Sequence, residues 1–135
     1  MRWGFLIGLL VVVSSCYGQS LRNSSNMLVG KIESDGVVRN ANYMMIGKFD
    51  PDGNVRNKNN MLVGKIEPNG TIRDRNDMEV GKVEADGTVR DCNNMMIGKV
   101  ESGGTVRDRS YMTIGYAKDV PIAKAAVFFF FNMFE

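Results

Sequence analysis

The stretch that decides the fold is "MLVGKIEPNGTIRDRND", residues 61–77. Seventeen residues later the chain reads "MEVGKVEADGTVRDCNN", and seventeen residues earlier it reads "MMIGKFDPDGNVRNKNN". A fixed period of this kind indicates a repeat architecture, in which each copy is one supersecondary unit that needs its neighbours for stability. A partial copy, "SLRNSSN", precedes the complete ones at 20–26, and a last copy leaves the pattern after Gly115.

The composition of the repeat favours strands over helices. Val and Ile dominate its apolar positions, and each copy carries two turn signals. In the copy at 61–77, Pro68 suits the second position of a type I turn, and Gly70 tolerates the positive φ that a three-residue hairpin loop needs. The pattern therefore predicts five hairpins, whose turns end at equivalent glycines: Gly36, Gly53, Gly70, Gly87 and Gly104.

The turn sets the register of each hairpin. With a three-residue loop Glu67 faces Thr71, which places Ile66 opposite Ile72 and Lys65 opposite Arg73. The spacing contains one irregularity. Alternate residues of a regular strand point to the same face, so Met61 and Val63 would point to the face opposite that of Ile66. A bulge or sharp bend at the recurring glycine of the strand would turn Met and Val inward as well. We assign this structural role to Gly30, Gly47, Gly64, Gly81 and Gly98.

The first residues have the features of a targeting segment. Arg2 precedes a ten-residue apolar run, Gly4 to Val13, which is too short for a membrane-spanning helix and is followed by small residues. Cleavage after Gly18 or Gln19 would release a soluble chain. The alternative is a bacterial lipobox, Val13-Ser14-Ser15-Cys16, with lipid attached to Cys16. Either alternative predicts an exported protein, located in the periplasm, at the cell surface or outside the cell.

The end of the chain, "KDVPIAKAAVFFFFNMFE", departs from the repeat. Asp119 can cap a helix with Val120 and Pro121 in its first turn, and the segment is apolar on nearly every side, so we expect it to be buried within the ring of hairpins. An extended strand, a contact between copies and an interfacial membrane contact are the alternatives. The predicted division is a signal peptide at 1–19, an all-β hairpin-repeat domain at 20–118 and an apolar segment at 119–135 that completes the core.

Five copies of M-x-[VI]-G-K-[IVF]-[ED]-x-x-G-x-[VI]-R, between a signal segment and an apolar tail, resemble the bacterial 5-fold β-flower proteins. The resemblance covers residues 20–135. It implies β-hairpins arranged around an axis with approximate five-fold symmetry, and it implies no established activity and no catalytic residues.

The residue inventory argues against an enzyme. The chain has no His, and its recurring acids occupy equivalent positions, whereas acid–base catalysis needs groups in distinct environments. We expect no catalytic residue, no metal site and no cofactor, because neither metal-ligand spacing nor a nucleotide-binding glycine motif is present. Only two cysteines exist, and Cys92 lies at a variable position typical of an exposed loop. The net charge of +2 gives no indication of a nucleic-acid partner.

Basic residues are the one recurring set with binding potential. If each Lys faces an Arg, the repeat gathers cations into a belt that could bind an anionic glycan, a lipid headgroup or an acidic envelope protein. The alternative is a solvated outer face, in which neighbouring Glu and Asp residues compensate the charge. We therefore predict a non-enzymatic protein with a structural or binding role at the bacterial cell envelope, or alternatively a polyanion-binding module. The belt consists of Lys31, Lys48, Lys65, Lys82, Lys99, Arg39, Arg56, Arg73, Arg90 and Arg107, with Arg22 in the same slot of the partial copy.

Overall fold

The computed structural model describes residues 19–134, so the signal peptide predicted for residues 1–19 and the lipobox Cys16 lie, except for Gln19, outside the described residues. The described chain forms twelve strands and one helix: β1 (Gln19–Asn23), β2 (Leu28–Ile32), β3 (Val37–Asn40), β4 (Met45–Phe49), β5 (Asn54–Asn57), β6 (Leu62–Ile66), β7 (Thr71–Asp74), β8 (Glu79–Val83), β9 (Thr88–Asp91), β10 (Met96–Val100), β11 (Thr105–Asp108), β12 (Thr113–Tyr116) and α2 (Ile122–Phe130).

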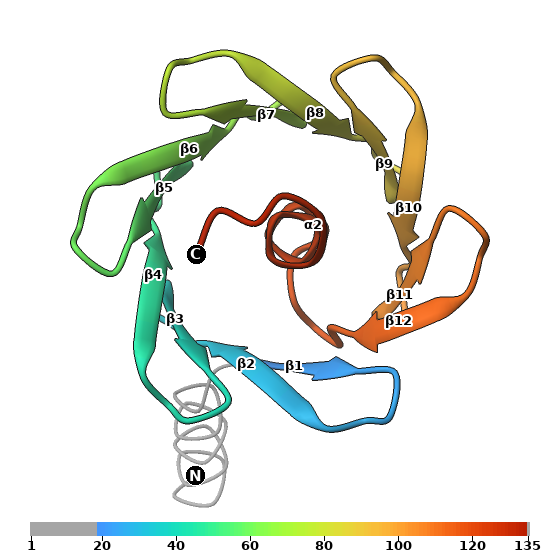
Figure 1. Cartoon of the computed structure of the whole chain (residues 1–135), viewed down its shortest axis with the longest axis horizontal. Coiled ribbons are helices and arrows are strands. Elements are labelled where there is room, and N and C mark those ends of the chain that lie inside the picture. The colour runs from blue at the N-terminus through green and yellow to red at the C-terminus, as the bar shows by residue number, and fades with distance from the viewer. Residues whose placement is uncertain (1–18, 135) are drawn as a thin grey trace, which may run out of the picture.

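The strands form a closed antiparallel barrel, as Figure 1 shows in a view down its axis. Each strand pairs with its neighbours in the chain, and β1 pairs with β12 to complete the ring. The five predicted hairpins with glycine turns are therefore present around an axis, from β2–β3 to β10–β11. The pair β1–β12 fills the remaining position and combines the partial first copy with the incomplete last one, which leaves no free edge strand.

The predicted register is confirmed. In the hairpin β6–β7, Lys65 is the partner of Arg73 and Ile66 is the partner of Ile72. Gly70 has a φ of 94°, and its carbonyl accepts a 2.9 Å hydrogen bond from the N–H of Val83 in the next repeat. Two independent reasons favour glycine at this turn: a residue with a Cβ would be strained at the positive φ, and its Cβ would collide with the Val83 carbonyl.

A bulge accompanies the recurring strand glycine, as predicted. In β3–β4, Val38 pairs with Gly47 but Arg39 pairs with Met45, so Ile46 is the extra residue. The same shift occurs at six equivalent places. It turns Val63 into the core, where it is 8% exposed.

The prediction that the first Met of each repeat points inward is wrong. Met61 is 55% exposed, and its five equivalents are 59–64% exposed. The reason is the position of this residue at the end of a tight loop, directly after a residue at positive φ (Asn60, 66°). These loops flare outward from the barrel in Figure 1, where no core is available to bury a side chain.

The outer loops are organised by the residue that closes each repeat. The side-chain oxygen of Asn57 accepts hydrogen bonds from the N–H groups of Asn59 (2.9 Å) and Met61 (3.0 Å). Asp91 holds Asn93 and Met95 in the same way. Short acceptor side chains of this kind replace missing backbone partners in turns. The Asn or Asp at this position is therefore a turn residue, a role that we did not predict from the sequence.

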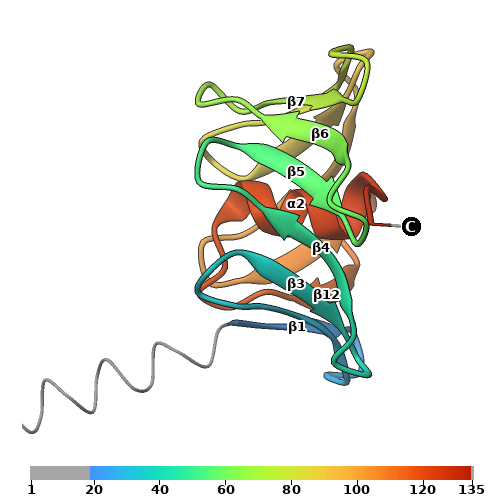
Figure 2. The same cartoon turned by 90° about the vertical axis from the view of Figure 1, so that its left-hand side faces the viewer.

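The C-terminal segment is helical and lies in the centre of the barrel, as predicted (Figures 1 and 2). Ala125, Ala126 and Val127 have no exposed surface. Asp119, however, does not cap the helix, which starts after Pro121 without a side-chain cap. Asp119 instead lies at a φ of 65° within a turn, which the N–H of Val120 closes by donating to the carbonyl of Ala117 at 3.1 Å.

Six large side chains of the tail face six strand glycines. A Cβ on Gly81 would lie 2.6 Å from the ring of Phe131, and one on Gly115 would lie 2.6 Å from the ring of Phe129. The assignments follow the ring in order, one repeat per side chain: Gly30–Phe128, Gly115–Phe129, Gly98–Phe130, Gly81–Phe131, Gly64–Met133 and Gly47–Phe134. The strand glycines thus leave the space on the inner wall that the tail fills, in addition to marking the bulge.

Candidate functional site

The predicted belt residues lie on the outer wall of the barrel. Side chains alternate along a strand, so Lys65 points outward between Gly64 and Ile66, which belong to the inner wall. Its partner across the hairpin is Arg73, and the same Lys–Arg pairing occurs in all five hairpins. The structure therefore brings the ten belt residues together as facing pairs.

The five arginines of the belt already have anionic partners. The Nε of Arg73 donates to Glu67 at 3.0 Å, and its NH1 group donates to the carbonyl of Asp77 at 3.1 Å in the outer loop. The hydrogen bond to Glu67 raises the pKa of the Arg73 guanidinium. Equivalent ion pairs measure 2.8–3.1 Å: Arg39–Glu33, Arg56–Asp50, Arg90–Glu84 and Arg107–Glu101.

The lysines of the belt differ from the arginines. Within residues 19–134, every ion pair involves an arginine and none involves a lysine. Lys31 lies over the ring of Tyr43, with its Nζ 5.6 Å from the ring centre, and Lys82 is exposed. The cations available to an external anion are therefore mainly the lysines.

The pair β1–β12 breaks this pattern and forms a seam. Arg22 occupies the arginine position, and its NH1 group donates to the carbonyl of Asn26 at 3.1 Å, as in the other repeats. The position of the facing lysine holds Tyr116, and the position of the carboxylate holds Lys118. In the described part of the chain, Arg22 has no ion pair.

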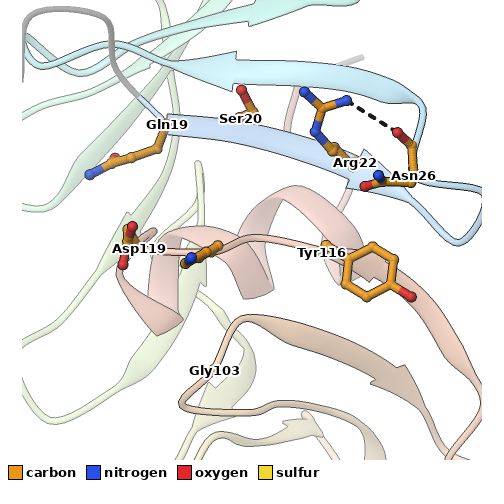
Figure 3. A pocket seen from close by; sticks show the side chains of 8 residues that line it. Gln19, Ser20, Arg22, Asn26, Gly103, Tyr116 and Asp119 are labelled. Carbon is orange, nitrogen blue, oxygen red and sulfur yellow. Dashed lines mark hydrogen bonds between the residues drawn. The ribbon is translucent and has the colours of Figure 1, made fainter. Parts of the chain in front are cut away.

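The seam is also open at one end. The hairpin β2–β3 has three paired positions, up to Ile32 and Val38, whereas β1–β12 has only Arg22–Tyr116 and Asn23–Gly115. The missing pairing leaves a pocket of about 440 Å³ beside the seam. Figure 3 shows the lining residues, which come from β1, β12, the segment after β12, the β1–β2 loop and the β10–β11 turn: Gln19, Ser20, Arg22, Tyr116, Lys118, Asp119, Asn26 and Gly103.

The remaining features considered in the sequence are the cysteine Cys92, a metal site and a membrane-spanning helix. Cys92 is an exposed free thiol in an outer loop, as expected. Among residues 19–134, no group of three or more potential ligands is arranged to hold a metal ion. The described segment also contains no helix long and apolar enough to cross a membrane.

The architecture defines a class of protein, the antiparallel barrel of hairpin repeats closed around a C-terminal helix. The chain belongs to the family described as 5-fold beta-flower protein, whose model matches residues 18–133. No curated protein and no solved structure matches the chain significantly.

Proposed function

We propose that this protein is an exported, non-enzymatic binding protein of the bacterial cell envelope and that its outer wall binds an anionic glycan. The observation that carries the proposal is the difference between the two cations of each repeat. The arginines are held by carboxylates, whereas Lys31, Lys48, Lys65, Lys82 and Lys99 project from the same wall without an ion pair among the described residues. Regularly spaced lysines attract an extended polyanion through summed electrostatic potential.

The filled interior supports a role for the outer surface. Small barrels that carry a ligand leave space within the barrel. Here α2 occupies the centre, and Phe131 and Phe134 after it lie against glycines of the inner wall. Leu21, Ile72 and Val106 of that wall have no exposed surface. A ligand must then contact the wall, the loops or the seam.

The chemistry of the carboxylates supports a non-enzymatic role. The five recurring acids each hold an arginine in the same geometry, with distances of 2.8–3.1 Å. All five carboxylates are thus engaged in the same structural ion pair, whereas general acid–base catalysis uses acids in distinct environments. The absence of His from the sequence points in the same direction.

The proposal is tested by retention on immobilised heparin over a range of salt concentrations. Replacement of Lys48, Lys65 and Lys82 by Gln should lower the salt concentration needed for elution. A control that replaces the exposed loop cations Lys58, Arg75 and Arg109 by Gln removes the same charge and should have a smaller effect. Absence of retention of the native protein at about 50 mM salt, where exposed charges are weakly screened, would refute glycan binding and leave a structural role.

Export and anchoring need a separate test. The proposal of export depends on the targeting features of residues 1–19, and lipidation depends on Cys16 alone. Metabolic labelling with a fatty-acid analogue should label the native protein but not Cys16→Ser if the lipobox is used. Unlabelled native protein in the exported fraction would support ordinary cleavage near Gly18.

A further inference from the structure

The seam between β1 and β12 differs from the other strand pairs in charge. Every complete repeat places one carboxylate beside its Lys–Arg pair, so each set carries two cations and one anion. At the seam the corresponding set is Arg22, Tyr116 and Lys118, which carries two cations and no anion. Asp119 is the one carboxylate lining the pocket. The pocket lining therefore carries two cations against one anion, and the carboxylate that the other repeats place on their arginine is missing beside Arg22.

The guanidinium of Arg22 is held in place by the β1–β2 loop. Its NH1 group donates to the Asn26 carbonyl at 3.1 Å, which is the same contact that fixes NH1 of Arg73 on the carbonyl of Asp77. In Arg73 the Nε donates to a carboxylate at 3.0 Å, and in Arg22 that donor has no side-chain partner within residues 19–134. A ligand carboxylate or sulfate at this position would complete the interaction that the other repeats make internally, and bidentate contacts of this type are strong.

The rest of the lining suits a hydroxyl-bearing ligand. Gln19, Ser20 and Asp119 supply hydrogen-bond donors and acceptors, and Tyr116 supplies an aromatic face that is 36% exposed. Figure 3 shows Tyr116 and Arg22 toward one end of the pocket and Gln19 and Asp119 toward the other. A volume of about 440 Å³ is sufficient for one or two sugar rings.

The pocket between the turns of β4–β5 and β6–β7 provides a contrast. It is smaller, about 310 Å³, and its lining has three carboxylates, Asp50, Asp52 and Glu67, against Lys124. An acidic ligand would be repelled there. The cationic character of the seam pocket is therefore a property of the broken repeat and not of the barrel surface in general.

We propose that the seam pocket binds a single acidic sugar unit, with its carboxylate or sulfate on Arg22 and Lys118 and its ring against Tyr116. This inference extends the proposed glycan binding, because it assigns recognition of one unit to one site, whereas the lysines of the wall would bind the polymer without preference for position. The seam can bind a monosaccharide even if the wall binds no polyanion.

The test is a titration of the full mature chain with glucuronate, followed by amide chemical shifts, with glucose as the neutral control and glucose 6-sulfate as the sulfate arm. Glucuronate or glucose 6-sulfate should shift residues 19–23 and 116–119, and glucose should bind at least 10-fold more weakly. The more effective of the two acidic sugars identifies the group that the pocket prefers. Equal shifts from all three sugars, or shifts confined to the lysine wall, would overturn the proposal.

Two variants make the test specific. Lys118→Glu restores the carboxylate of the other repeats beside Arg22 and should weaken binding at least 10-fold without loss of the fold. Lys58→Glu makes the same charge change in an exposed outer loop, away from both the seam and the lysine wall, and should leave monosaccharide binding within about 2-fold. Unchanged affinity of Lys118→Glu, with a native circular dichroism spectrum, would refute the site and leave the proposed function of the wall untouched.

Discussion

Replacement of Gly81 by Ala tests whether the strand glycines exist to receive the tail. An added Cβ would lie 2.6 Å from two ring carbons of Phe131 and would also crowd the backbone carbonyl of Arg90. The ring can move in part, but the backbone carbonyl belongs to the neighbouring strand. Overpacking of this kind costs about 1–3 kcal/mol. We therefore expect Gly81→Ala to lower the free energy of unfolding by that amount, measured by urea denaturation and circular dichroism.

Two other Gly→Ala variants, at Gly103 and Gly30, serve as a control and as an intermediate case for this prediction. Gly103→Ala adds the same methyl group where no atom lies within 4 Å, and it should be neutral or stabilise by about 0.4–1 kcal/mol, because Ala restricts the unfolded chain. Gly30 is intermediate, since its Cβ would lie 2.9 Å from the edge of Phe128 and 3.1 Å from the Arg39 carbonyl. Its cost should fall in the double variant with Phe128→Leu.

Equal unfolding midpoints for Gly81→Ala and Gly103→Ala would show that the strand glycine does not make room for the tail. The same would follow if Phe128→Leu failed to reduce the cost of Gly30→Ala in a double-mutant cycle, because the two residues would then not share one space.

Three further predictions concern the tail, the outer loops and the glycine turns. Deletion of residues 128–134 should cause aggregation, detected by light scattering, because it uncovers the inner wall and removes partly buried Phe side chains that each contribute less than the ~1.5–3 kcal/mol of full burial. A monomeric, cooperatively folding deletion would contradict the central position of the tail. Asp91→Ala should destabilise by about 0.5–2 kcal/mol through loss of the hydrogen bonds from Asn93 and Met95, whereas Asp91→Asn, which copies the native Asn57, should be close to neutral; equal losses in both would show that the turn does not depend on the acceptor oxygen. The N–H of Thr88 lowers the pKa of Asp86 from its ordinary value of 3.8, so the charged carboxylate stabilises the fold above pH 3.8, and this stabilisation is lost as the pH falls through the lowered pKa. Asp86→Asn should therefore be less stable than the native protein at pH 7 but not at pH 2. The same difference in stability at both pH values would count against the lowered pKa.

The hairpins could be predicted because their determinants are local. The loop from Glu67 to Gly70 sets the pairing of Ile66 with Ile72, and no distant contact is needed to know it. The helical, buried tail also followed from its uniform apolarity. The prediction that Met61 points into the core was wrong. The alternation of side chains along a strand does not indicate where the strand leaves the barrel and the outer loop begins.

The belt was predicted only in part. The facing of Lys65 and Arg73 followed from the register, but the ion pair of Arg73 with Glu67 depends on side-chain directions across the hairpin. The role of Asn57 and its equivalents in the outer loops was missed, although a signal was present, since an Asn or Asp recurs there in every copy. The pocket residues Gln19, Tyr116 and Lys118 carried no signal of their own.

The sequence by itself determined the repeating unit, because a two-stranded hairpin with a glycine turn is specified by residues a few positions apart. The tertiary structure alone decided how the ring closes, since closure joins β1 to β12, whose residues are separated by almost the whole domain. That closure brings an incomplete first copy against an incomplete last copy, and it creates the seam pocket. It also gives each strand glycine its partner in the tail, because only a closed ring has a centre for the helix to occupy.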